Sequence, residues 1–225
     1  MTGSSPSRGG RRTGLLLLCG AAAGPLFTAV VLVQVLTRDG FDLSHQPLSL
    51  LSLGELGWVQ VTNFVTAGAL MVALALGMSR VLTAGPGRTW APLLTALNGV
   101  GLILGGLFLP DPGLGFPPGT PDGIPSDLSW HGILHAGAPP LAFAALVVCC
   151  FVFVRRSAAE RRGRMLYAGA TGLSVLVLSL WPGQEGMGVR LFLAVAVGLA
   201  WTTFVALDLR TSLESASPVL RPGSR

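Results

Sequence analysis

Three histidines and one aspartate are the side chains whose types and spacing suit metal or acid–base chemistry. His131 and His135 stand four residues apart, so a helix would place both imidazoles on one face, one turn from each other. This is the spacing at which two imidazoles on a helix share one zinc ion. His45 and Asp111 lie in other segments, from which they could approach the pair.

Three chemical interpretations of these residues stay open. In the first, His45, His131 and His135 bind zinc, while Asp111 acts as a catalytic base or orients a metal-bound water. In the second, histidines ligate haem, a role that also suits imidazole. In the third, they cap helix ends and bond loop carbonyls. The pair lacks the glutamate of the zinc-protease motif, so the spacing alone does not decide among the three.

Six apolar stretches must position these residues. Hydrophobic residues make up 51% of the 225 positions and charged residues only 11%, which is far from the composition of a soluble domain. Each stretch can cross a hydrocarbon core about 30 Å thick as a helix, and the first is too long for the core of a cleaved signal peptide. We therefore expect an all-α polytopic bundle with six transmembrane spans, at residues 14–36, 59–79, 90–109, 130–154, 164–181 and 188–208.

The fifteen basic residues, all arginines, predict how the bundle lies in the membrane. Thirteen lie in the two ends of the chain, in the gaps after the second and fourth spans or, for Arg164, at the start of the fifth span, and only Arg38 and Arg190 lie on the opposite side. Because arginine-rich segments stay on the cytoplasmic side, we expect cytoplasmic N and C termini and a multi-pass protein of the inner (plasma) membrane. The expected partner of this charge is anionic lipid on the cytoplasmic side, and we expect no nucleic acid.

The two polar ends flank the membrane domain. We expect residues 1–13 and 210–225 to be disordered cytoplasmic tails around a transmembrane domain of residues 14–209. The longest gaps follow the first and third spans, on the predicted outer side. Long loops on a compact bundle are where function is most often found, and these two hold His45 and Asp111.

Polar and small residues within the spans predict how the helices pack. Gly101 and Gly105 form a Gly-x-x-x-Gly pattern, which lets a neighbouring helix approach closely. Polar side chains cost free energy in lipid unless they are hydrogen-bonded. We therefore expect four of them to face the bundle interior: Gln34, Gln60, Asn63 and Asn98.

Two loop signatures carry a family resemblance. One is FDLSHQPLS at residues 41–49, and the other is FLPDP at residues 108–112, followed by the histidine pair. With both signatures, and over nearly its whole length, the chain resembles the bacterial six-helix membrane proteins grouped as domain of unknown function 998 (DUF998). The resemblance implies the six-helix architecture. It implies no activity, because none is established for that family.

Two functions from different classes follow. The leading hypothesis is a membrane protein of uncharacterised function whose outer face binds a small molecule, a lipid or a partner protein. The alternative is an outer-facing zinc-dependent membrane hydrolase acting on a lipid or amide substrate. Membrane hydrolases of the alkaline ceramidase and adiponectin-receptor type resemble the chain in residue types, because they combine serine, aspartate and three histidines. The sequence leaves open whether the chain is an enzyme, which ligand it takes and whether it forms oligomers.

Overall fold

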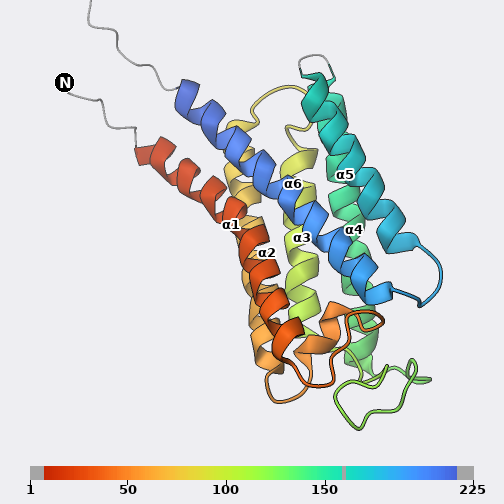
Figure 1. The fold of residues 1–225 in the computed structure, drawn as a ribbon. Coiled ribbons are helices and arrows are strands. Elements are labelled where there is room, and N and C mark those ends of the chain that lie inside the picture. The colour runs from red at the N-terminus through yellow and green to blue at the C-terminus, as the bar shows by residue number, and fades with distance from the viewer. Residues whose placement is uncertain (1–7, 159–160, 217–225) are drawn as a thin grey trace, which may run out of the picture.

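The computed structural model describes residues 8–158 and 161–216. Long helices follow one another through this part of the chain, and a short 3₁₀ helix stands in the first long loop (Figure 1). The helices are α1 (Arg8–Thr37), η1 (Leu48–Ser52), α2 (Gly57–Val81), α3 (Trp90–Leu107), α4 (Trp130–Ser157), α5 (Arg162–Leu180) and α6 (Met187–Ala216).

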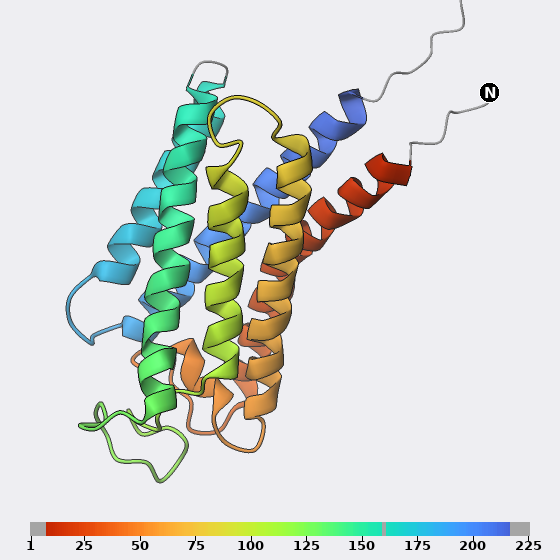
Figure 2. The same ribbon diagram turned by 180° about the vertical axis from the view of Figure 1, so that it is seen from behind.

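Within the described residues, six helices are long and apolar enough to cross a membrane. They agree with the six predicted spans, which confirms the all-α polytopic bundle. Consecutive long helices run in opposite directions and pack on one another, and α1 also packs on α6 (Figures 1 and 2). The protein is therefore a multi-pass membrane protein.

The two ends of the bundle carry different connections. One end, which we call the tail end, has the start of α1, the end of α6 and the short connections α2–α3 and α4–α5 (Figure 1). The other, the loop end, has η1 and the two long connections α1–α2 and α3–α4 (Figure 2). The arginine-rich segments lie at the tail end, which the charge pattern predicts to be cytoplasmic. That orientation, and the kind of membrane, stay predictions.

Polar side chains join the helices from inside. Gln34 of α1 donates a hydrogen bond of 2.7 Å to Gln60 of α2, and Asn63 donates one of 3.2 Å to a backbone carbonyl of α1. Asn98 of α3 donates to the carbonyl oxygen of Ala142 in α4 at 2.9 Å. All four predicted polar side chains are at most 5% exposed. The prediction that they face the interior is confirmed.

Glycine permits the closest approach of α3 to α4. A Cβ on Gly101 would lie 2.8 Å from the Cβ of Ala142, nearer than real Cβ atoms approach, so only glycine fits without a shift. A Cβ on Gly105 would meet nothing nearer than the Cβ of Ala138 at 3.9 Å, which is an ordinary contact. The predicted close contact is confirmed at the first glycine, whereas the second leaves space between the helices.

The structure differs from the sequence prediction at both ends. Residues 8–13 and 210–216, which we expected to be disordered, are helical turns of α1 and α6. Arginine has a high helix propensity, and the Arg210 guanidinium pairs with Glu214 one turn later, Nε to Oε1 2.9 Å. Polarity alone therefore does not end these helices. Residues 1–7 and 217–225, the rest of the predicted tails, lie outside the described residues.

A small second core closes the loop end. Leu50, Leu53 and Phe116 are buried in it. Arg38 donates to the carbonyl oxygens of Leu51 at 3.2 Å and Leu53 at 2.6 Å, and its Cζ lies 5.4 Å from the centre of the Phe116 ring. Partial burial lowers the pKa of Arg38 from its high ordinary value. One arginine thus fixes the α1–α2 loop against the α3–α4 loop.

Candidate functional site at the loop end

The helix histidines lie where α3 ends and α4 begins. Nδ1 of His135 is 2.7 Å from the carbonyl oxygen of Phe108. Nδ1 of His131 is 3.0 Å from the carbonyl oxygen of Leu109. Because a carbonyl oxygen only accepts hydrogen bonds, each Nδ1 carries a proton and donates it. In a neutral ring, Nε2 of each histidine is then an acceptor.

Asp111 caps the first turn of α4. Its Oδ2 accepts a hydrogen bond from the backbone N–H of Ser129 at 2.9 Å, and the Ser129 hydroxyl accepts one from Gly132 at 3.1 Å. Hydrogen bonding from the Ser129 side chain, then from its amide, together with attraction to two nearby histidines, holds the pKa of Asp111 below its usual range. The helix dipole also stabilises a negative charge at the N-terminus of a helix. The sequence interpretation gave capping to the histidines and not to Asp111.

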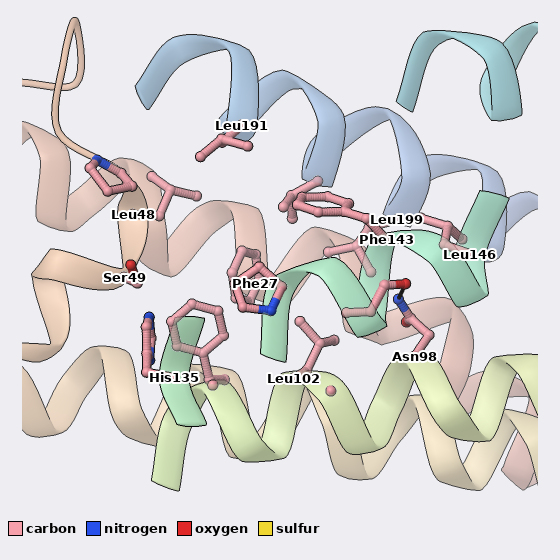
Figure 3. A pocket seen from close by; sticks show the side chains of 17 residues that line it. Phe27, Leu48, Ser49, Asn98, Leu102, His135, Phe143, Leu146, Leu191 and Leu199 are labelled. Atoms are coloured by element: carbon pink, nitrogen blue, oxygen red, sulfur yellow. Dashed lines mark hydrogen bonds between the residues drawn. The ribbon is translucent and has the colours of Figure 1, made fainter. Parts of the chain in front are cut away.

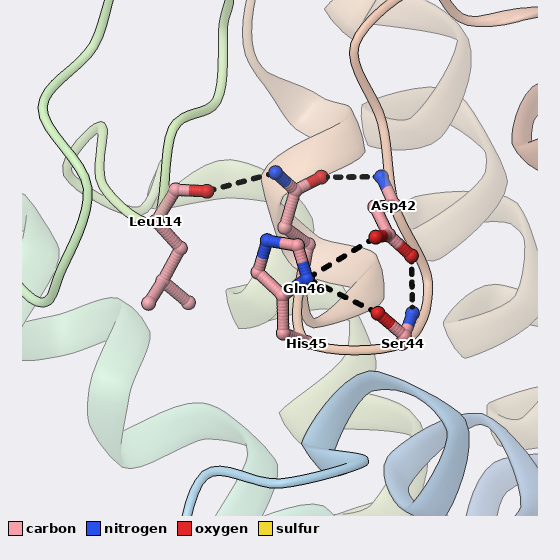
Figure 4. A network of polar contacts seen from close by, with 5 residues as sticks. All are labelled: Asp42, Ser44, His45, Gln46 and Leu114. Carbon is pink, nitrogen blue, oxygen red and sulfur yellow. Dashed lines mark hydrogen bonds and ion pairs between the residues drawn. The ribbon is translucent and has the colours of Figure 1, made fainter.

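His45 belongs to a different cluster, in the α1–α2 loop (Figure 4). Its Nδ1 lies 3.2 Å from Oγ of Ser44 and 3.4 Å from Oδ2 of Asp42. These are the residue types of a hydrolytic triad, but both partners meet the same ring nitrogen. A triad histidine holds its serine and its acid on opposite nitrogens. The observed cluster therefore does not have the geometry of a triad.

Gln46 joins the two long loops (Figure 4). Its Oε1 accepts from the backbone N–H of Asp42 at 2.7 Å, and its Nε2 donates to the carbonyl oxygen of Leu114 at 2.8 Å. The side chain is almost fully buried. Sequence reasoning gave this residue no role beyond its place in the first loop signature.

The structure brings part of the predicted metal site together. Asp111, His131 and His135 share the α3–α4 junction, whereas His45 contacts Asp42 and Ser44. Across residues 8–158 and 161–216, no three His, Cys, Asp or Glu side chains are placed so that they could hold a metal ion. Zinc or haem binding by these histidines, and catalysis by Asp111, stay predictions.

A cavity of about 90 Å³ lies among the helices beneath η1, with His135 in its wall. Apart from Asn98, His135 and Ser49, its lining side chains are apolar or glycine. Figure 3 shows His135 and Asn98 towards opposite ends of this space, with Phe27 and Leu102 between them. The cavity thus extends from the loop end into the bundle.

Two buried polar atoms of this wall lack a hydrogen-bond partner within the described chain: Nε2 of His135 and Oδ1 of Asn98. The other polar atom of each side chain is used, by Phe108 and by Ala142 respectively. Buried polar groups are nearly always paired, so an unpaired one needs a physical explanation. Here the two side chains that carry such atoms line one apolar cavity.

Comparison with protein-family models matches residues 21–208 to the family described as "Protein of unknown function (DUF998)". The chain belongs to this family. The DUF998 region begins within α1 and ends within α6, so it contains both long loops and the cavity. Searches of curated proteins and of solved structures found no match. Membership confirms the resemblance and the architecture, and it assigns no chemistry to the DUF998 residues.

The cavity is the feature of this DUF998 protein that sequence reasoning missed. A signal was present on α3, where Asn98, Gly101 and Gly105 stand three and four residues apart and so share one helix face. All three line the cavity. The sequence predicted their roles singly, as a polar contact and as packing glycines. Only the structure shows that this face meets His135.

Proposed function

We propose that this protein binds, inside the loop-end half of its bundle, a slender apolar molecule that carries a hydroxyl or an amide N–H. One observation carries the proposal: Nε2 of His135 and Oδ1 of Asn98 are buried and unpaired within the described chain, and both side chains line an otherwise apolar cavity. An apolar pocket with a few placed polar groups is the usual form of a small-molecule site.

Both free atoms favour the same ligand chemistry. Since Nδ1 of His135 donates to a carbonyl, the neutral ring offers Nε2 as an acceptor. The amide nitrogen of Asn98 is likewise engaged, which leaves its oxygen. A ligand hydroxyl or N–H would satisfy either atom, whereas an alkane would satisfy neither. A buried acceptor left unpaired costs about 1–3 kcal/mol, so the two atoms discriminate between such molecules.

The size of the cavity favours a single hydrocarbon chain. An apolar cavity of roughly 150 Å³ holds one benzene ring, and the space here is about 90 Å³. Asn98 and Gly105 both line it and stand seven residues apart on α3, which is roughly 10 Å along a helix axis. A long and narrow space suits a chain better than a ring. The space can hold the polar end and the first few carbons of a lipid alcohol or fatty amide, and the rest of the chain would extend beyond it.

Binding of dodecan-1-ol, compared with dodecane, tests the proposal. We expect the alcohol to raise the thermal unfolding midpoint of the detergent-solubilised protein more than the alkane does, because only the alcohol donates a hydrogen bond. His135→Phe keeps a ring but removes the acceptor, so it should abolish this difference. His131→Phe is the matched control, since it loses the same kind of bond to a carbonyl without lining the cavity. Equal effects of the two probes on the unchanged protein would contradict the proposal.

A pair of leucine substitutions tests the place of binding. Leu102→Trp fills the cavity and should remove the effect of dodecan-1-ol. Leu97→Trp makes the same change on α3 at a side chain that is 36% exposed and does not line the cavity, so the effect should persist. Loss in both variants, or in neither, would show that the alcohol acts elsewhere.

Zinc-dependent hydrolysis of a lipid or amide is the second candidate. It is favoured by the orientation of His131 and His135, because a zinc-binding histidine commonly donates its other ring N–H to a carbonyl or carboxylate. Asp111 beside them would be the base, as the sequence suggested. The candidate needs a third protein ligand, and His45 would have to leave its contacts with Asp42 and Ser44 to supply it.

A further inference from the structure

A second cavity, of about 510 Å³, opens at the tail end, among α2, α4, α5 and α6. We call it the basic cleft. Its charged lining consists of four arginines and one aspartate, so positive charge is in excess. The arginines come from the end of α2, the end of α4 and the start of α5: Arg80, Arg156, Arg161 and Arg164.

The fold itself uses two of the four arginines. Arg156 donates to two carbonyl oxygens of the α2–α3 loop, at 3.0 and 2.9 Å, and Arg164 forms an ion pair with Asp208 of α6. The guanidinium groups of Arg80 and Arg161 have no hydrogen-bond or ion-pair partner in the described chain. Two guanidinium groups at the rim of the cleft are therefore free to bind an anion.

The deeper wall of the basic cleft is apolar. Phe153 and Trp201 line it with ring centres 5.3 Å apart, and both are buried. Trp201 precedes Asp208 by seven residues on α6, which places it roughly 10 Å further into the bundle. Phe204 and Val205 complete this wall. Charge at the rim and aromatic or aliphatic side chains below match a molecule with an anionic head and an apolar tail.

We propose that the basic cleft binds the phosphate of an anionic phospholipid, with Arg80 and Arg161 contacting the phosphate oxygens. The planar guanidinium fork matches phosphate geometry. Basic pockets between transmembrane helices on the cytoplasmic side are known to bind anionic lipid headgroups. The site lies at the opposite end of the bundle from the cavity beside His135, so this proposal does not depend on the first.

Two double variants with equal charge change test the site. Arg80→Gln/Arg161→Gln removes the free guanidinium groups and spares Arg156 and Arg164, which the fold uses. Arg155→Gln/Arg162→Gln is the matched control, because these two exposed arginines also lie at the ends of α4 and α5 but do not line the cleft. Neither variant removes a side-chain hydrogen bond or ion pair of the described residues, so a difference between them reports on the cleft.

The measurement is the apparent affinity of the detergent-solubilised protein for phosphatidylglycerol, from the rise of its unfolding midpoint with lipid concentration. Phosphatidylcholine and inorganic phosphate are the comparison probes. We expect stabilisation by phosphatidylglycerol alone, roughly 30-fold weaker apparent affinity in the cleft variant and little change in the control. Similar losses in both variants, or none, would overturn the proposal. Equal stabilisation by inorganic phosphate would overturn the lipid assignment, since the acyl chains would then play no part.

Discussion

Nδ1 of His135 donates to the carbonyl oxygen of Phe108 across the whole α3–α4 loop, at 2.7 Å. His131 repeats the contact with Leu109, at 3.0 Å. The two bonds hold the first turns of α4 against the end of α3, where His135 lines the cavity. The same bond would also fix the ring of a metal ligand. Metal analysis separates the two roles.

We expect the purified protein to contain far less than one zinc per chain, because His45 contacts Asp42 and Ser44 and does not complete a three-ligand group. Elemental mass spectrometry of the protein, beside His131→Ala/His135→Ala, measures this directly. Near-stoichiometric zinc that disappears in the variant would support the hydrolase instead. An absorbance spectrum of the same samples serves as the control for haem, since a Soret band would show that haem is bound.

The two glycines of the Gly-x-x-x-Gly pattern should respond differently to alanine. Gly101→Ala places a Cβ 2.8 Å from that of Ala142, so α3 and α4 must separate. We expect a loss of about 1–3 kcal/mol, as for other overpacked sites. Gly105→Ala meets only an ordinary contact at 3.9 Å and gains helix propensity, so its effect should lie between neutral and about 1 kcal/mol stabilising. Unfolding in mixed detergent gives both values, and equal losses would contradict this account of the packing.

The contrast between these glycines shows how far the sequence could predict the fold. Hydropathy and length determine the six helices, because each span must bury its backbone polar groups within a helix in lipid. The pattern predicts a close contact but not which glycine makes it, since that depends on how close α3 and α4 come at Ala142 and at Ala138. The helical ends at residues 8–13 and 210–216 were missed because polarity indicates exposure and says little about helix formation.

The candidate site was predictable only in part, because segments far apart in the sequence form it. An i, i+4 spacing on α4 was enough to place His131 and His135 on neighbouring turns. Asp111 comes beside them because it follows α3 closely and caps the helix that begins at Trp130. Where His45 lies depends on how a loop of some twenty residues folds, and no periodicity describes that. The cavity is a gap between five helices, α1, α2, α3, α4 and α6, so no single segment encodes it.

Acid should destabilise the loop end through Asp111. Its folded-state pKa is depressed, so its stabilising effect is full above the ordinary aspartate value of about 3.9 and is lost as the pH falls through the folded value. We expect the unfolding midpoint to fall as the pH drops below about 4, and Asp111→Asn to flatten part of that fall. Asp42 also has a lowered pKa, through the Ser44 amide, so some dependence remains. Asp122→Asn, the same change in the same loop, is the control, and an equal flattening there would contradict the capping role.

The orientation that the thirteen arginines predict can be measured with single cysteines. Ser126→Cys exposes a thiol in the α3–α4 loop at the loop end, and Thr89→Cys exposes one at the tail end. Because the arginine-rich end should be cytoplasmic, a membrane-impermeant thiol reagent should label the first variant in intact cells and the second only after permeabilisation. The unsubstituted protein controls for its own cysteines, of which Cys149 and Cys150 are buried. The reverse labelling would place the basic cleft outside, away from the anionic leaflet, and the cavity beside His135 on the cytoplasmic side.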